Sequence, residues 1–271
     1  MITFPNAKIN LGLYVERKRE DGYHDLSTVF YPIPLTDAVE VVEAKETALF
    51  TYGNPVDCPP EKNLVMKAYR LMEEEFKLPP VAIHLYKHIP DGAGLGGGSS
   101  DATSVAKILN SMFALGLSEE EIAVRVKRLG ADCPFFAYNR PMAARGIGDL
   151  LEPVDVDLRG YTMIVVKPDV SVPTAAAYAG VTLRVPETDV EKLVAKPVGQ
   201  WKGLLVNDFE ESIFPKHPEL SAIKQSLYDA GAVYASMSGS GSAIFGLFED
   251  DNLSDIFAAK CAQPLLYKMK L

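Results

Sequence analysis

A run of glycines followed by serines, between residues 90 and 100, is the first stretch whose composition suggests chemistry. Residues 90–103 are PDGAGLGGGSSDAT, preceded by an apolar, strand-like segment and followed by a helical pattern. Glycine costs conformational entropy wherever it is ordered, so such a cluster needs a reason. Bare backbone N–H groups at the start of a helix favour a bound anion. The loop therefore predicts a site for a nucleotide triphosphate, with an ordinary glycine-rich turn as the alternative.

Two better-known phosphate motifs describe this loop less well. Residues 92–97 match the dinucleotide pattern G-x-G-x-x-G, and they lie between an expected strand and an expected helix. The match is weak, because it does not fall in a first strand–helix turn and no repeated strand–helix units surround it. The Walker pattern fails, because no Gly-Lys-Ser/Thr follows the glycines. An oxidoreductase that binds a dinucleotide is therefore only a distant alternative.

Three further stretches carry residues that could act in a reaction. Lys8 stands in the apolar run PNAKINL, and Asp132 follows an expected helix and precedes an expected apolar strand in RLGADCPFF. A second loop of small residues, SMSGSGSAIFG, contains Gly239 and Gly241 between two expected strands. Taken singly, each has an ordinary explanation: a lysine on a solvated strand face, a turn-forming aspartate, and a hairpin turn.

The elements that must position these residues are of mixed type. Alternating or β-branched runs predict strands, and apolar residues at helical spacing predict helices. The helix after the glycine loop would be capped by Ser99, Ser100 or Asp101. A capping-box pattern runs from Ser118 to Glu121. Strands and helices do not alternate regularly, so we expect an α+β protein. The expected strands include 7–18, 26–34, 37–44, 48–52, 81–89, 161–168, 232–237, 243–249 and 264–270, and the expected helices include 63–76, 118–130, 219–231 and 252–260.

Length and composition narrow the class of protein. The chain has 271 residues, which is enough for two domains, and an acidic, proline-containing stretch near residues 150–160 predicts a boundary between residues 1–155 and 156–271. A net charge of −9 argues against nucleic acid or an anionic membrane as a partner. Three scattered cysteines and no long apolar segment predict a soluble, cytoplasmic protein. Motifs of zinc hydrolases and of α/β-hydrolases are missing from the sequence.

Considered together, the four stretches resemble one family. PNAKINLGL, DGAGLGGGSSDA, GADCPFF and SGSGSAIFG, in this order and at these spacings, are similar to the motifs of the GHMP superfamily of small-molecule kinases. DGYHDLSTVF, VSVPTAAAY and LVNDFE resemble a branch whose alcohol substrate carries a cytidine diphosphate group, in the non-mevalonate isoprenoid precursor pathway. The resemblance runs from about residue 3 to about residue 250.

The resemblance implies a fold and a nucleotide site. The fold would be the two-domain GHMP kinase architecture, with an N-terminal domain like the second domain of ribosomal protein S5 and a ferredoxin-like C-terminal domain. ATP would be the phosphate donor, accompanied by Mg²⁺, for which related kinases suggest Ser99 or Ser100 as a ligand. The residues implied at the ATP site are Pro90, Asp91, Gly92, Ala93, Gly94, Leu95, Gly96, Gly97, Gly98, Ser99, Ser100, Gly239 and Gly241.

The resemblance also implies roles for the other motifs. Asp132 would accept the proton of the acceptor hydroxyl, and Lys8 would orient that hydroxyl and stabilise its developing charge. The residues implied at the acceptor site are Tyr23, His24 and Tyr178 for the cytosine ring, and Asn10 and Thr174 for the methylerythritol part. A kinase of the same superfamily with another alcohol substrate, and a silent ATP-binding sensor, stay as alternatives. The protein would be a monomer or a homodimer.

Overall fold

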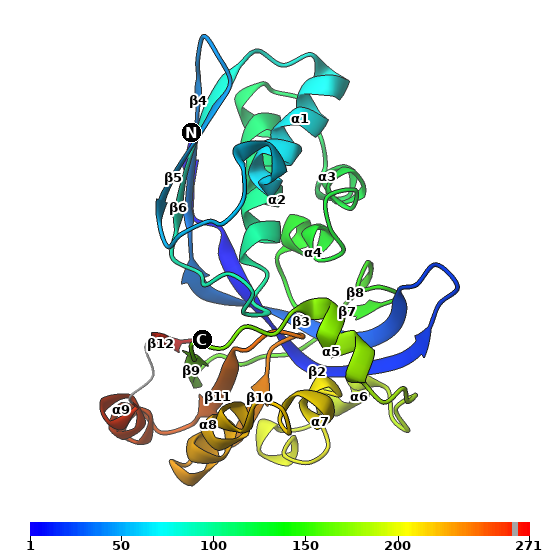
Figure 1. The fold of residues 1–271 in the computed structure, drawn as a ribbon, viewed down its shortest axis with the longest axis vertical. Helices are drawn as coiled ribbons and strands as arrows, with labels where there is room; N and C mark the ends of the chain where they lie inside the picture. The colour runs from blue at the N-terminus through cyan, green and yellow to red at the C-terminus, as the bar shows by residue number, and fades with distance from the viewer. Residues whose placement is uncertain (262–264) are drawn as a thin grey trace. The chain divides into compact units, whose positions relative to one another are not determined.

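The computed structural model describes residues 1–261 and 265–271 (Figure 1). Contacts divide the chain into two compact units, each described separately below. The first unit comprises residues 1–7, 35–91 and 96–140, and the second comprises residues 8–34, 92–95 and 141–271. These segments interleave along the chain. The predicted division between residues 155 and 156 stays a prediction.

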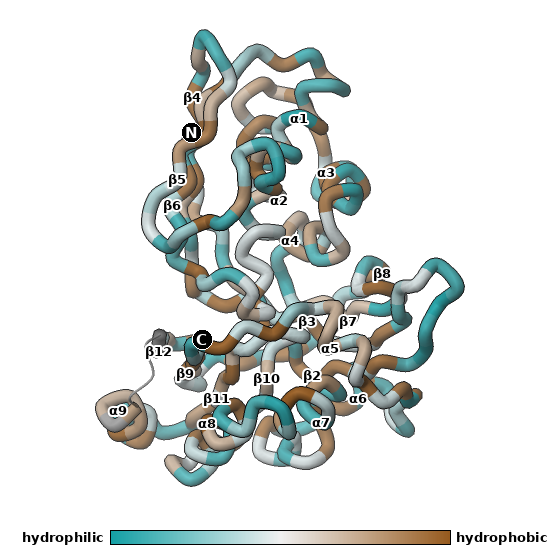
Figure 2. The backbone as a smooth tube through the Cα atoms, viewed as in Figure 1, coloured by the Kyte–Doolittle hydropathy of each residue, from teal (hydrophilic) through white to brown (hydrophobic). Residues whose placement is uncertain are grey.

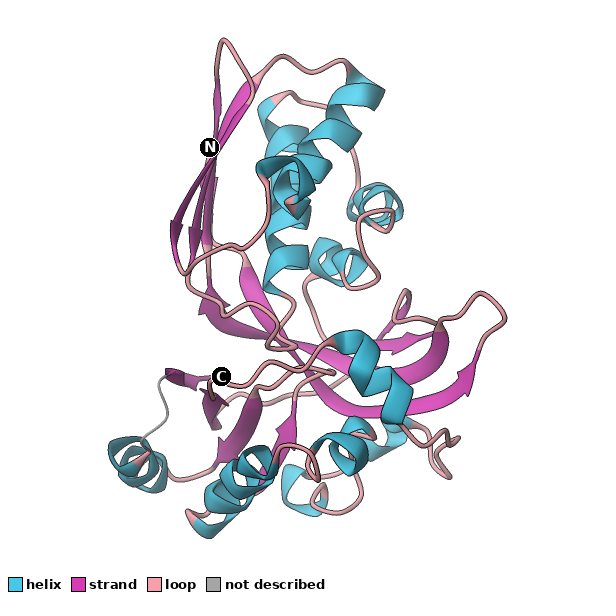
Figure 3. Ribbon diagram, in the orientation of Figure 1, coloured by secondary structure: helices cyan, strands magenta, loops and turns pink. Residues whose placement is uncertain are grey.

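The first unit is a four-stranded sheet with helices on one of its faces (Figure 3). The strand order is β1-β4-β6-β5, in which β4 is antiparallel to β6 and β5 is parallel to it. The elements are β1 (Ile2–Thr3), β4 (Ala38–Glu43), β5 (Ala48–Gly53), η1 (Pro60–Lys62), α1 (Leu64–Phe76), β6 (Val81–Lys87), α2 (Gly97–Met112), α3 (Glu119–Val126) and α4 (Cys133–Tyr138).

Side-chain periodicity explains why this sheet has one covered face. In β6, Ile83 and Leu85 are buried whereas Tyr86 is exposed, which follows from the two-residue period of a strand. The buried strand residues pack with apolar residues of the helices, such as Tyr69 of α1 and Leu109 of α2, in one core cluster. In Figure 2 hydrophobic colours recur along these strands and helices. This core holds the strand before the glycine loop and the helix after it.

Several helix ends follow the sequence and two details differ. The predicted capping box at Ser118 and Glu121 is present at the start of α3. The cap predicted for α2 at Ser99–Asp101 is wrong: Gly96 occupies the N-cap with a φ of 73°, and the serines lie in the first helical turn. The strand predicted after Asp132 is wrong too, because residues 133–138 form α4. Pro134 favours a helix start and cannot donate to a strand ladder.

The second unit contains two four-stranded sheets, ordered β2-β3-β7-β8 and β10-β11-β9-β12. Leu13, Ile164 and Phe209 contribute to one buried apolar cluster in this unit. These sheets, together with the helices of both units, confirm the predicted α+β class. The elements are β2 (Asn6–Lys18), β3 (His24–Thr36), β7 (Met142–Arg145), β8 (Leu150–Pro153), β9 (Thr162–Lys167), α5 (Thr174–Gly180), α6 (Val190–Val194), η2 (Val198–Gln200), α7 (Phe209–Ile213), α8 (Pro218–Asp229), β10 (Tyr234–Met237), β11 (Ile244–Phe248), α9 (Asp251–Lys260) and β12 (Leu265–Lys270).

Pro264, which opens the last predicted strand, lies outside the described residues. Within the described ranges, no helix is long and apolar enough to span a bilayer.

Candidate active site

In the second unit, the loop between β10 and β11 packs directly on residues 92–95. Ala243 donates its backbone N–H to the Ala93 carbonyl at 3.2 Å, and the Ser238 hydroxyl donates to the Gly94 carbonyl at 3.0 Å. A Cβ on Gly94 would lie 1.9 Å from the Ser238 carbonyl oxygen, and one on Gly241 would lie 2.2 Å from the Ala93 carbonyl carbon. Only glycine permits such close backbone contact. The structure therefore brings the two glycine-rich stretches together here, and their binding of phosphate stays a prediction.

Lys8 is a buried side chain, which removes the interpretation of a solvated strand lysine. Its exposed fraction is 3%, and its Nζ donates to Asn10 Oδ1 at 2.7 Å and lies 4.9 Å from the centroid of the Phe30 ring. Asn10 Nδ2 in turn donates to Thr28 Oγ1 at 3.0 Å, and Thr28 donates to the Gly12 carbonyl. This chain of hydrogen bonds fixes the position of the ammonium group.

Asn10 also connects Lys8 with the second glycine loop. A Cβ on Gly239 would lie 3.3 Å from Asn10 Oδ1 and 3.4 Å from the Cα of Gly94. In the second unit the structure thus brings together Lys8, Asn10 and both glycine-rich stretches. The Asn10 side chain is engaged by Lys8 and Thr28. The contact predicted between Asn10 and the acceptor stays a prediction.

Asp132 belongs to the first unit and lies directly before α4, half-buried. The Thr103 hydroxyl ties this corner to the helix after the glycine loop, since it contacts the carbonyl oxygens of Ser99 and Cys133 at 2.9 and 3.0 Å. Asp132 therefore directly precedes a residue, Cys133, whose backbone is hydrogen-bonded to α2. The pairing of Asp132 with Lys8, which belongs to the other unit, stays a prediction.

Two of the three aromatic residues predicted to hold a base meet in the second unit. The rings of His24 and Tyr178 stack with centroids 4.9 Å apart and planes inclined by 25°, and Phe209 packs edge-on against Tyr178 at 4.8 Å. Tyr23 is exposed, with 61% of its surface accessible. Burial and the positive charge of Lys18 lower the pKa of His24 from its usual 6.5, so the imidazole is neutral at neutral pH.

The acceptor-site residue Thr174 also lies in the second unit, at the start of α5. It is exposed, and its hydroxyl oxygen lies 3.4 Å from the hydroxyl oxygen of Ser240 in the second glycine loop. The predicted acceptor-site residues are thus spread over β2, β3, α5 and the turn before β3.

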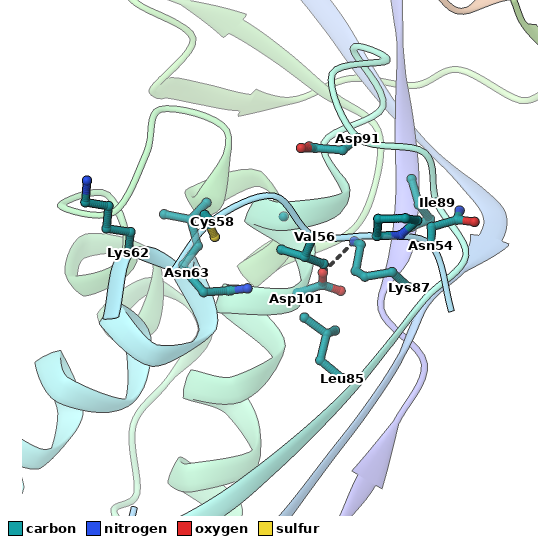
Figure 4. A pocket seen from close by; sticks show the side chains of 13 residues that line it. Asn54, Val56, Cys58, Lys62, Asn63, Leu85, Lys87, Ile89, Asp91 and Asp101 are labelled. Carbon is teal, nitrogen blue, oxygen red and sulfur yellow. Dashed lines mark hydrogen bonds and ion pairs between the residues drawn. The ribbon is translucent and has the colours of Figure 1, made fainter. Parts of the chain in front are cut away.

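A cavity of about 210 Å³ in the first unit was not predicted from the sequence (Figure 4). It lies beside the end of β6, and Asp91 and Gly98 of the glycine loop belong to its lining. No local pattern in the sequence indicates it, because its lining comes from separate segments of the chain. The residues that line it are Asn54, Pro55, Val56, Cys58, Lys62, Asn63, Leu64, Leu85, Lys87, Ile89, Asp91, Gly98 and Asp101.

A buried ion cluster beside this cavity was also missed. Lys87 Nζ donates to Asp101 Oδ2 at 2.7 Å and to Asp37 Oδ2, and all three side chains are almost fully buried. Burial raises the pKa of Asp101 to about 7, a rise that Lys87 opposes and Asp37 reinforces.

Comparison with known proteins places this arrangement in a family. The family model "GHMP kinases N terminal domain" matches residues 63–140, and "GHMP kinases C terminal" matches residues 190–264. A 4-diphosphocytidyl-2-C-methyl-D-erythritol kinase from Bacteroides thetaiotaomicron is 52% identical over 255 residues, which cover 93% of each chain. One from Cytophaga hutchinsonii is 46% identical, covering 98% of this chain and all of its own. The chain belongs to the 4-diphosphocytidyl-2-C-methyl-D-erythritol kinases of the GHMP superfamily.

Solved structures confirm the expected GHMP kinase fold. A crystal structure of a 4-(cytidine 5'-diphospho)-2C-methyl-D-erythritol kinase matches with a TM-score of 0.84 and 33% identity, covering 99% of this chain and 98% of the other. The mevalonate kinase of Methanococcus jannaschii matches with a TM-score of 0.76 at 14% identity, which shows a common fold and nothing more. The predicted family and branch are thereby confirmed, and the dinucleotide alternative loses its support.

Proposed function

We propose that the protein transfers the γ-phosphoryl group of ATP to the 2-hydroxyl of 4-diphosphocytidyl-2-C-methyl-D-erythritol. The observation that carries the proposal is the near full-length identity with kinases of that name. We further propose the predicted cytoplasmic location and a monomer or homodimer as its working form. The role of the enzyme would be in the supply of isoprenoid precursors.

We place the phosphates of ATP at the glycine loop and its nucleoside in the cavity of the first unit. Two observations support this placement. Gly92 is exposed, with nothing within 4 Å of a Cβ placed on it, and the loop continues into the N-terminus of α2, a 16-residue helix. The cavity lining includes Asp91 and Gly98 of that same loop, so the phosphates attached to a nucleoside in the cavity would lie along the loop.

We propose Lys8 and Asp132 as the catalytic residues. Phosphoryl transfer has a loose transition state, so positioning and charge stabilisation supply most of the rate. Asp132 would accept the proton of the acceptor hydroxyl while the hydroxyl oxygen bonds to the γ-phosphorus and ADP leaves. Lys8, fixed by Asn10, would orient that oxygen and stabilise its negative charge. In this scheme Asn10 serves the reaction through Lys8 as well as by any contact with the acceptor.

We propose Mg²⁺ as the accompanying ion. Kinases usually hold Mg²⁺ through substrate phosphates and only one or two protein groups, so the ion would arrive with ATP. Ser99 and Ser100 lie in the first turn of α2 and are the hydroxyl groups that could complete its coordination. The ion would neutralise charge that builds up on the phosphates.

For the acceptor, we propose that Tyr23, His24 and Tyr178 hold the cytosine ring. The rings of His24 and Tyr178 contact each other at 4.9 Å, too close to admit a base between them, so the base would stack on an outer face. The exposed Tyr23 offers a second stacking surface. A neutral imidazole both donates and accepts hydrogen bonds, which suits the polar edge of cytosine. Thr174 would contact the methylerythritol part.

The test is ADP release by the purified protein with ATP and Mg²⁺. The cytidyl alcohol, free methylerythritol phosphate, homoserine and mevalonate are offered separately at equal concentrations. We expect turnover with the cytidyl alcohol alone. Turnover with another alcohol would contradict the substrate assignment but keep a GHMP kinase. ATP binding without turnover of any alcohol would point to the sensor and overturn the proposal.

A further inference from the structure

The buried cluster of Asp37, Lys87 and Asp101 connects the two ends of the glycine loop. Asp37 joins β3 to β4, and its Oδ1 accepts the backbone N–H groups of His88 at 2.5 Å and Ile89 at 2.8 Å. These are the two residues that precede Pro90. The other oxygen, Oδ2, accepts a hydrogen bond from the Lys87 ammonium group. Asp37 thus holds the backbone and a side chain at the start of the loop.

The same ammonium group holds the far end of the loop (Figure 4). Lys87 Nζ donates to Asp101 Oδ2 at 2.7 Å, and Asp101 lies in the first part of α2, after the glycines and the two serines. Gly97 packs on the same group, since a Cβ there would lie 3.2 Å from Lys87 Nζ and 2.9 Å from Ile89 Cγ2. The segment between Ile89 and Gly97 therefore begins and ends beside one ammonium group.

Stability does not account well for this cluster. Two carboxylates share one ammonium group, and the exposed side-chain fractions are 0% for Asp37, 2% for Asp101 and 8% for Lys87. Among the described residues, Asp101 Oδ1 has no hydrogen-bond partner. Buried ion pairs contribute little net stability, because desolvation offsets their attraction, and an unsatisfied buried acceptor adds a further cost. What the cluster does provide is a defined geometry for the loop.

We propose that Asp37 is a positioning residue for the phosphates of ATP, acting through Lys87 on both ends of the glycine loop. The inference rests on the proposed function, because it concerns the same ATP site. Asp37 is neither part of the cavity lining nor part of the loop. Any effect of Asp37 on ATP must therefore pass through Lys87, His88 and Ile89.

The test variant is Asp37→Asn, which has the same shape. An amide oxygen can still accept from His88 and Ile89, but the amide nitrogen would face the Lys87 ammonium group as a second donor. The change thus breaks the link to Lys87 and leaves the Lys87–Asp101 pair. We expect the KM for ATP to rise about tenfold, the kcat to change less than threefold, and the KM for the cytidyl alcohol to stay within about twofold.

The matched control is Asn110→Ala, at the other end of α2. Asn110 exchanges two hydrogen bonds of 2.9 Å with the backbone of Leu117, so its loss destabilises the same helix without touching the loop. We expect a lower Tm and unchanged KM values for both substrates. A rise in the KM for ATP equal to that of Asp37→Asn would show a general effect of destabilisation and would overturn the inference.

An unchanged KM for ATP in Asp37→Asn, or an equal rise for both substrates, would likewise overturn it. If Asp37→Asn does not fold, Asp101→Asn serves as a second variant, because its amide oxygen still accepts from Lys87. It should raise the KM for ATP about threefold, and no change would count against the inference. Failure of the proposed function is distinguishable, because the wild-type protein would then release no ADP.

Discussion

Two buried lysines of this protein are fixed by contacts of different kinds. Lys87, in the first unit, contacts the carboxylates of Asp37 and Asp101. Lys8, in the second unit, contacts the amide oxygen of Asn10 and the face of the Phe30 ring. Carboxylates neutralise the charge of Lys87 within its own unit, so we assign it to holding the loop. Asn10 fixes the position of the Lys8 ammonium group, which suits a role in the reaction.

Replacing each lysine by methionine should separate the two roles most strongly. Lys8→Met should lower kcat by about 1,000-fold or more, because the transition state loses a fixed charge. Lys87→Met leaves two buried carboxylates without their cation and should destabilise the protein by about 3–5 kcal/mol. Turnover and urea unfolding of both variants provide the measurement. A stable but inactive Lys87→Met together with an active but destabilised Lys8→Met would contradict both assignments.

The second expected effect concerns Asp132. Asp132→Asn keeps the shape of the side chain but removes its ability to take a proton, so turnover should fall by about 100-fold or more. ATP affinity, measured by calorimetry, should be nearly unchanged, in contrast with Asp37→Asn. Near-normal turnover would remove Asp132 from the catalytic pair.

Two glycines of the same loop provide a third comparison. Gly94 has a φ of +80° and no room for a Cβ, whereas Gly92 has a φ of +63° with nothing within 4 Å of a Cβ. Gly92→Ala should therefore cost only backbone strain, about 1–2 kcal/mol of unfolding free energy. Gly94→Ala must also push the backbone of the loop away from Ser238 and should raise the KM for ATP by tenfold or more. If the two variants showed the same change in Tm and the same change in the KM for ATP, the close contact of Gly94 with Ser238 would be contradicted.

The smallest expected effect is on the acceptor site. His24→Ala should raise the KM of the cytidyl alcohol several-fold and leave the KM for ATP unchanged. Because the pKa of His24 is lowered from 6.5, the imidazole is neutral above that pH and becomes protonated only below it. The KM of the wild-type protein should thus be constant at neutral pH and rise only at a pH below 6.5. The KM of His24→Ala should not depend on pH in this range. A wild-type KM that is equally independent of pH would contradict the role of His24 in binding the base.

Local signals predicted part of this structure well. Apolar spacing and a capping box predicted α1 and α3, whereas the backbone contact of Gly94 with Ser238 was not predicted. The helix after Asp132 could not be predicted, because periodicity alone cannot separate a short buried helix from a strand.

The cluster around Lys87 could not be predicted in this way. Asp37 is 50 residues from Lys87 in the sequence, and Asp101 is 14 residues from it. No local pattern relates side chains at such separations, so their contact follows only from the folded sheet and helix. The cavity beside them has the same origin, because its lining comes from the connection before α1, from β6 and from α2.

The most direct test of the account is the position of the transferred phosphate. The wild-type protein is incubated with ATP, Mg²⁺ and 4-diphosphocytidyl-2-C-methyl-D-erythritol, and the product is examined by phosphorus NMR. The account predicts one new phosphate monoester on the 2-hydroxyl, formed in equal amount to ADP, and none with Lys8→Met. A phosphate on another hydroxyl, or ADP formed without a phosphorylated alcohol, would contradict it.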